Sequence, residues 1–197
     1  MAIYGAALTA EQRIAQGPSL RGDTKSLVGA LLLAVAFSVN MQITERIDQV
    51  WTAGVAVPLG HTFAQLWWPT AVVFFGLTGA LIVSNFNPII AVLSATHPLA
   101  WSFFFLNMAE MVPLAWLFRA HFRRQNDISL PTFMLYVAVG DGLANLVQAV
   151  GLYGVVLKFE LKQIVVLFLW QWGMAVIIGS LMGWAFYQAV RRSGIFG

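Results

Sequence analysis

The chain has 197 residues, of which 59% are hydrophobic and only 10% are charged, and its mean hydropathy is +0.77. Soluble domains carry about 25% charged residues, so the composition predicts an integral membrane protein folded as one compact helical bundle. The sequence contains no cysteine, which excludes disulfide bonds, thiolate catalysis and cysteine-based metal sites. In a membrane protein, a formal charge of +3 indicates basic cytoplasmic loops and not nucleic-acid binding.

Residues 1–25 form a polar arm that lacks the apolar core and cleavage site of a signal peptide. Thr9 and Gln12 have the spacing of a capping box, so we expect a short amphipathic helix on the membrane surface. The predicted organisation is a cytoplasmic arm at 1–25, a single transmembrane helical bundle at 26–192 and a cytoplasmic tail at 193–197.

The first long apolar stretch, residues 26–44, carries no charge and is long enough to span a membrane. Residues 49–63 are mixed in character and predict a loop or a partly inserted segment, and residues 63–83 predict the second helix. Later apolar stretches predict three more helices, at 99–118, 131–157 and 163–190.

The segment "SNFNP" at 84–88 predicts a break in the chain, because Pro88 fits the first turn of a helix but not its interior. Residues 89–96 provide about 12 Å of helix, against a hydrocarbon core of about 30 Å. We therefore expect a short third segment, either tilted or re-entrant, whose backbone ends are sheltered by protein.

The cations predict the orientation of the bundle. If the clusters before the first helix, after the fourth and after the sixth all face the cytoplasm, both termini lie inside and the number of helices is even. The expected fold is therefore an all-α integral membrane protein, a compact bundle of about six transmembrane helices with a short third segment and cytoplasmic termini. The cations of these clusters are Arg13, Arg21, Lys25, Arg119, Arg123, Arg124, Arg191 and Arg192.

Three polar residues interrupt the apolar stretch 131–157, and their spacing places them on one helical face. They are Asp141, Asn145 and Gln148. A carboxyl group at bilayer depth costs at least about 2.5 kcal/mol, so this face must meet the bundle interior or a water-filled cavity. The three residues predict either one wall of a ligand site or a polar clamp between helices.

Further polar residues lie in neighbouring apolar stretches. Asn107 and Glu110 precede Pro113, so they either stabilise a proline kink or line the same cavity as Asp141. Gln171 and the adjacent Trp172 predict a third wall of that cavity or an interfacial pair.

No catalytic set is recognisable. The sequence has no G-x-S-x-G, H-E-x-x-H or phosphate-loop motif, which predicts a protein that is not an enzyme and holds no cofactor. A small membrane enzyme that uses Asp141 or Glu110 as an acid or base would lack every other catalytic group. None of His61, His97 and His121 has a metal-type partner three or four residues away, so we expect no metal site.

Aromatic residues and carboxylates gather in the predicted outer half of the bundle. This combination suits a flat or cationic ligand through stacking and cation–π attraction, and it also suits an aromatic belt that anchors the bundle in lipid. The residues concerned are Trp51, Trp67, Trp68, Trp101, Trp170, Trp172, Glu45, Asp48 and Glu160.

Small residues repeat every four positions in two of the predicted helices. Ala30 and Ala34 do so in the first helix, and Ala175, Gly179 and Gly183 do so in the last. Such stripes allow close helix packing, either inside the bundle or against another membrane protein.

The even topology, the short segment at 87–96 and the Ala30-xxx-Ala34 pair resemble the S-components of energy-coupling factor (ECF) transporters. That resemblance implies a six-helix subunit that captures a micronutrient from the outer side of the plasma membrane. It also implies partners, a membrane scaffold subunit and ATPase subunits, and a role for Ala30 and Ala34 in docking onto the scaffold.

The expected function is thus capture of a small aromatic or cationic ligand of the thiamine or pyrimidine-precursor class. The alternative is an accessory subunit of a respiratory or photosynthetic membrane complex. The predicted ligand-binding residues are Asp141, Asn145, Gln148, Gln171, Trp172, Asn107 and Glu110, with Trp51 and His61 in the covering loop.

Overall fold

The computed structural model describes residues 24–94 and 99–195, and all regular structure in these ranges is helical. The predicted arm at 1–25 lies almost entirely outside the described residues, and His97 lies wholly outside them. The helices are α2 (Thr24–Thr52), α3 (Pro58–Leu93), η1 (Ala100–Ser102), α4 (Phe103–Phe122), α5 (Leu130–Val147), η2 (Gln148–Val156), α6 (Leu161–Met174), η3 (Ala175–Gly179) and α7 (Ser180–Ser193).

Five of the described helical stretches are long and apolar enough to cross a membrane. η1 precedes α4 directly, η2 continues α5, and η3 joins α6 to α7. The predicted all-helical, multi-pass membrane architecture is therefore confirmed. The five stretches are Ser26–Thr52, Pro58–Leu93, Ala100–Phe122, Leu130–Val156 and Leu161–Ser193.

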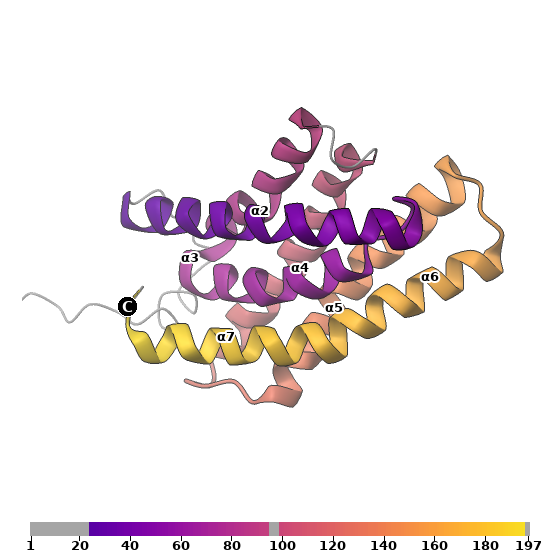
Figure 1. Cartoon of the computed structure of the whole chain (residues 1–197). Helices are drawn as coiled ribbons and strands as arrows, with labels where there is room; N and C mark the ends of the chain where they lie inside the picture. The colour runs from indigo at the N-terminus through magenta and orange to yellow at the C-terminus, as the bar shows by residue number, and fades with distance from the viewer. Residues whose placement is uncertain (1–23, 95–98, 196–197) are drawn as a thin grey trace, which may run out of the picture.

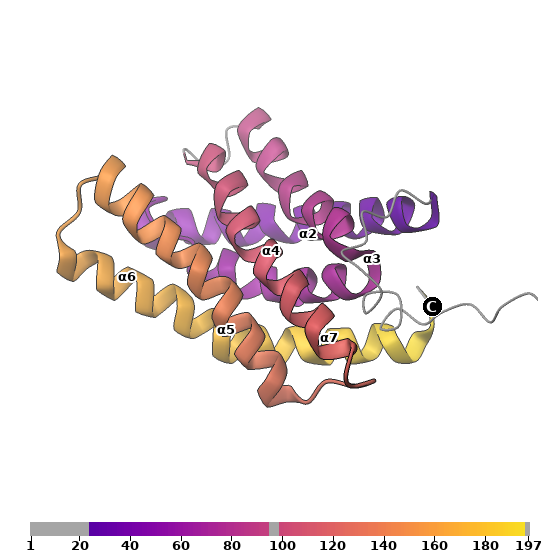
Figure 2. The same cartoon turned by 180° about the vertical axis from the view of Figure 1, so that it is seen from behind.

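The helices form two obliquely crossing layers. In Figure 1, α2, the first half of α3 and the continuous rod of α6 and α7 lie in front of the second half of α3, α4 and α5. Figure 2 shows the same layers from behind. The start of α2 and the end of α7 lie at the same end of the bundle (Figure 1), as the charge pattern predicts. The side of the membrane that this end faces stays a prediction.

Gly76 divides α3 into two halves that run in different directions (Figure 1). Its backbone angles are φ 66° and ψ −168°, a conformation that residues with a Cβ rarely adopt. The break therefore falls at Gly76 and not at 84–88, and the prediction of a short third segment beginning at Pro88 is wrong. A bundle that crosses the membrane six times remains a prediction. It requires residues 58–75 and residues 77–93 each to cross the membrane.

Pro88 is accommodated inside the second half of α3 because its missing hydrogen bond is replaced. A proline leaves the carbonyl four residues earlier without its helical donor, here that of Ser84. The side-chain amide of Asn107 donates to the Ser84 carbonyl oxygen at 2.6 Å. A polar side chain from α4 thus supplies the donor that lipid cannot supply.

The small-residue stripes pack inside the bundle. Ala30 and Ala34 have no exposed surface. A Cβ added to Gly183 would lie 2.1 Å from the carbonyl oxygen of Gln65, so the backbones of α7 and α3 are in direct contact. Ala30 and Ala34 therefore contact neighbouring helices of the bundle, and their predicted role in docking onto a scaffold stays a prediction.

The apolar core lies between the two layers and is rich in aromatic side chains. Phe118 packs edge-on against Phe133 and Tyr136 and stacks on Phe122, with ring centroids 5.5–6.2 Å apart. Tyr187 of α7 stacks on Phe133 at 6.4 Å. These contacts join α4, α5 and α7 around one aromatic cluster.

Candidate functional site

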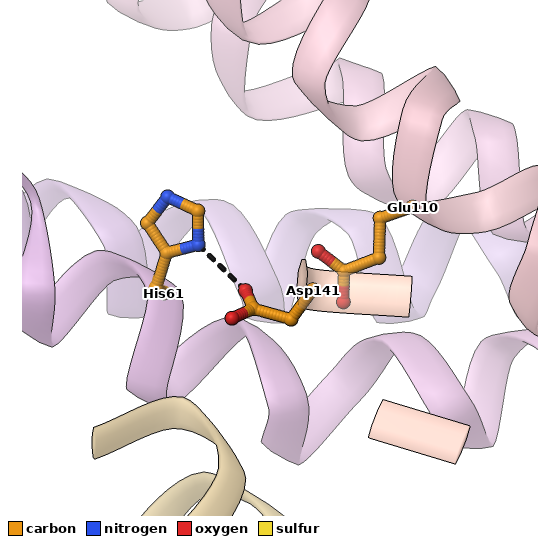
Figure 3. Close-up of side chains that lie close together, drawn as sticks. All are labelled: His61, Glu110 and Asp141. Atoms are coloured by element: carbon orange, nitrogen blue, oxygen red, sulfur yellow. Dashed lines mark hydrogen bonds and ion pairs between the residues drawn. The ribbon is translucent and has the colours of Figure 1, made fainter. Parts of the chain in front are cut away.

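Asp141 and His61 form the centre of the buried polar region. The Nδ1 atom of His61, in the first turn of α3, lies 2.7 Å from Oδ1 of Asp141 on α5 (Figure 3). Asn145 donates its side-chain amide to the other carboxylate oxygen of Asp141 at 2.8 Å. Asp141 has no exposed surface and His61 is 7% exposed, so this network lies inside the protein and away from lipid.

Glu110 extends from α4 towards this pair (Figure 3). Its Oε1 atom accepts a hydrogen bond from the side-chain amide of Gln65 at 2.7 Å. Its Oε2 atom is buried and has no hydrogen-bond partner among the described residues. One ligating atom each from His61, Glu110 and Asp141 lie within 4.8 Å of one another, and all three residues are buried.

A cavity adjoins this cluster between α2, both halves of α3 and α4. About 30 Å³ of it admits the centre of a water molecule. In this conformation it therefore has room for one or two waters. Its wall includes Phe37, Met41, Glu45, Val57, Gly60, His61, Trp68, Asn87, Phe103, Asn107 and Glu110.

Glu45 is a second buried carboxylate in the cavity wall. Its Oε1 atom accepts a hydrogen bond from the Asn87 side chain at 2.6 Å, and Oε2 has no partner among the described residues. Phe37, Met41 and Glu45 repeat every four residues on one face of α2. Sequence analysis placed Glu45 among the carboxylates that suit a cationic ligand but did not include it among the predicted ligand-binding residues. Asn87 carried no such signal, because residues 84–88 were predicted as a break.

Gln171 and Gln148 form a clamp beside the cavity. Gln171 donates to the Gln148 side chain at 3.4 Å and to the Tyr153 hydroxyl at 3.1 Å. Its oxygen accepts from the backbone N–H of Val57 at 2.8 Å, which holds the segment between α2 and α3 against α6. For this pair the clamp interpretation describes the contacts best.

Asp48 holds the first turn of α3, which follows this segment. Its two carboxylate oxygens accept the backbone N–H groups of Leu59 at 3.1 Å and Gly60 at 2.8 Å. These N–H groups belong to the first turn of α3, which has no helical acceptors for them and carries the positive end of the helix dipole. Sequence analysis placed Asp48 among the carboxylates of the predicted outer half and missed this buried capping role.

The predicted site residues therefore separate into groups. His61, Asn107 and Glu110 line the cavity, and Asp141 with Asn145 lies behind His61. Trp172 instead donates its indole N–H to the Ala138 carbonyl at 2.9 Å, which joins α6 to α5. Trp51 is 61% exposed and lines a separate open cleft with Phe159, Lys162 and Trp170. Neither tryptophan is part of the cavity wall.

Comparison with known proteins identifies the fold. No protein-family model and no curated protein matches the chain. Among solved structures, it is similar to the crystal structure of an S-component of an ECF transporter, with a TM-score of 0.65 over 89% of each chain and 13% sequence identity. The resemblance inferred from the sequence is thus confirmed at the level of the fold.

Proposed function

We propose that this chain is the substrate-capture subunit of an ECF-type uptake transporter in the plasma membrane. The observation that carries the proposal is the fold shared with an ECF S-component over 89% of both chains. A cavity enclosed by membrane-spanning helices and lined by polar groups supports it, because such cavities are the usual sites for small ligands.

The cavity wall favours a ligand that carries N–H donors or a positive charge. Glu45 and Glu110 each carry one buried carboxylate oxygen that has no hydrogen-bond partner among the described residues. An unsatisfied buried acceptor costs about 1–3 kcal/mol or more. Phe37, Trp68 and Phe103 supply aromatic surface in the same wall. A small amino-substituted or cationic aromatic molecule satisfies both features, which supports the thiamine or pyrimidine-precursor class.

Ligand entry requires the cavity to widen, because its present free space is far smaller than a vitamin. The segment at 53–57 is the proposed cover, since it adjoins the cavity through Val57, whose N–H is held by Gln171. Asp48 holds the first turn of α3, which follows this segment. Release of the Gln171–Val57 hydrogen bond would allow this segment to move away from the cavity and admit the ligand.

The first test is to identify small molecules that co-purify with the full chain, by mass spectrometry after mild extraction. We then expect Glu45→Gln and Glu110→Gln to weaken binding of thiamine by at least about tenfold, the scale of one charge-assisted hydrogen bond. Glu160→Gln is the matched control, because Glu160 is exposed and lies outside the cavity wall. Unchanged affinity in both cavity variants would contradict the ligand assignment.

The partner assignment has a separate test. A chain tagged in its native membrane should be recovered with a membrane scaffold subunit and ATPase subunits. Recovery with electron-transfer proteins would instead support the accessory-subunit alternative and overturn the transport function.

A further inference from the structure

The His61–Glu110–Asp141 cluster has the composition of a metal centre. We propose that these three side chains bind one divalent transition-metal ion at the edge of the cavity. The proposal goes beyond the transport function, because it adds an inorganic ion whose ligands include Glu110, a residue that the organic ligand also contacts. Glu45, on the opposite helix α2, remains available to that ligand.

The three residues are positioned by three different helices, α3, α4 and α5. Their ligating atoms lie within 4.8 Å of one another, and His61 Nδ1 is 2.7 Å from Asp141 Oδ1. Donor atoms that share one ion at about 2.0–2.2 Å are about 3–3.5 Å apart in tetrahedral geometry. Small side-chain rotations are therefore enough to place all three around one ion.

The charges of the cluster favour a divalent cation. Two buried carboxylates face a single imidazole, and in the described residues neither Glu110 nor Asp141 forms an ion pair with a lysine or arginine. Negative charge without a counter-charge is costly at this depth. A divalent ion bound to neutral His61 and two carboxylates leaves the cluster with no net charge.

Each carboxylate is oriented by a carboxamide behind it. Gln65 donates to Glu110 at 2.7 Å, and Asn145 donates to Asp141 at 2.8 Å. Hydrogen bonds of this kind fix the ligand side chains in protein metal centres, and their loss typically lowers metal affinity about 10- to 100-fold. The pattern therefore supplies both the ligands and the groups that orient them.

The unpartnered Glu110 Oε2 atom is a further ligand position, independent of the clustering itself. It is buried, lacks any partner in the described ranges and belongs to a residue of the cavity wall. Three protein ligands leave at least one coordination position open towards the cavity. A mixture of one imidazole and two carboxylates suits ions such as Zn²⁺, Co²⁺ and Mn²⁺.

The experiment uses the full chain, purified in detergent, treated with a chelator and titrated with Co²⁺. We expect visible absorption bands of protein-bound Co²⁺ and one ion per chain by elemental analysis. His61→Gln, Glu110→Gln and Asp141→Asn should each abolish the bands. His121→Gln is the matched control, since His121 is also buried but bonds to Tyr136 and the Asp127 carbonyl, away from the cluster.

A further variant tests the site without removing any of its ligands, so that loss of binding can be distinguished from loss of folding. Asn145→Leu keeps all three ligands and should lower Co²⁺ affinity about 10- to 100-fold. Absence of Co²⁺ binding by the wild-type chain, or binding that survives His61→Gln in a normally folded variant, overturns the proposal. Either result leaves the transport function intact, because that function is judged by the co-purified ligand and the partner subunits.

Discussion

The side-chain amide of Asn107 lies 2.6 Å from the carbonyl oxygen of Ser84, four residues before Pro88. The contact joins α4 to the second half of α3 at the position where the proline removes a helical hydrogen bond. It explains why "SNFNP", which reads as a chain break, is continuous helix in the folded protein.

Asn107→Leu should therefore destabilise the protein. The substitution keeps the side-chain volume but leaves a buried carbonyl without a donor, at a cost of about 1–3 kcal/mol. Thermal unfolding in detergent measures the effect. Asn85→Leu is the matched control, because the Asn85 amide bonds to the Leu81 carbonyl of its own helix. Equal losses in the two variants would show that the contact across helices has no special role.

Close contact between α7 and α3 gives a second prediction. A Cβ at position 183 would lie 2.1 Å from the Gln65 carbonyl oxygen, whereas a Cβ at Gly173 meets nothing within 4 Å. Gly183→Ala must push the helices apart and should cost about 1–3 kcal/mol, the typical penalty of overpacking. Gly173→Ala should be neutral or slightly stabilising, because alanine favours helix. Similar melting temperatures for the two variants would contradict the packing described for Gly183.

These contacts show what the sequence was able to predict. Hydropathy and helical spacing predicted an all-helical membrane bundle and grouped Asp141, Asn145 and Glu110 as buried polar residues, because burial in a membrane depends on composition and period. The partners of those residues depend on tertiary contacts with no local signal. His61 was expected in a loop, yet Pro58 begins α3 and Asp48 caps it, so the imidazole lies on a helix facing Asp141.

The position of the helix break was unpredictable for a similar reason. Gly76 is one of several glycines in an apolar run, and only the folded chain shows its positive φ of 66°. Pro88 gave the stronger local signal, but Asn107 overrides it from 19 positions further along the chain. A tertiary hydrogen bond therefore decides which of two potential breaks is used.

The loop between α4 and α5 gives a prediction about pH. Slight burial acts to raise the pKa of Asp127, but hydrogen bonds from the Ile128 N–H and the Gln188 side chain, together with the Arg191 guanidinium, lower it below its ordinary value. A lowered pKa in the folded state means that the ionised carboxylate stabilises the fold. That stabilisation is complete above the ordinary aspartate pKa of about 3.9 and disappears as pH falls through the lowered value.

Asp127→Asn should therefore melt at a lower temperature than the wild type at pH 7, and the difference should shrink as pH falls below about 4. The effect is small, because Asp127 is 66% exposed and solvent screens the ion pair. Added salt should reduce it further. A difference that stays constant between pH 7 and pH 3 would assign the effect to hydrogen-bond geometry and not to charge.

Gln171 gives the last prediction, which concerns opening of the cavity. Its oxygen accepts the Val57 N–H at 2.8 Å, and its amide donates to Tyr153 at 3.1 Å. Gln171→Leu removes the acceptor, so the segment at 53–57 should exchange its amide hydrogens faster, as measured by hydrogen–deuterium exchange mass spectrometry. Loss of the buried bonds should also cost about 1–3 kcal/mol of stability.

Gln188→Leu is the matched control for this experiment, because Gln188 lies on α7 and donates to Asp127 in the loop between α4 and α5, away from the segment at 53–57. It should leave exchange at 53–57 unchanged. If that segment covers the cavity, ligand association should also be faster in Gln171→Leu than in the control. Faster exchange without faster association would separate the mobility of the segment from ligand entry, and the route into the cavity would then have to lie between other helices.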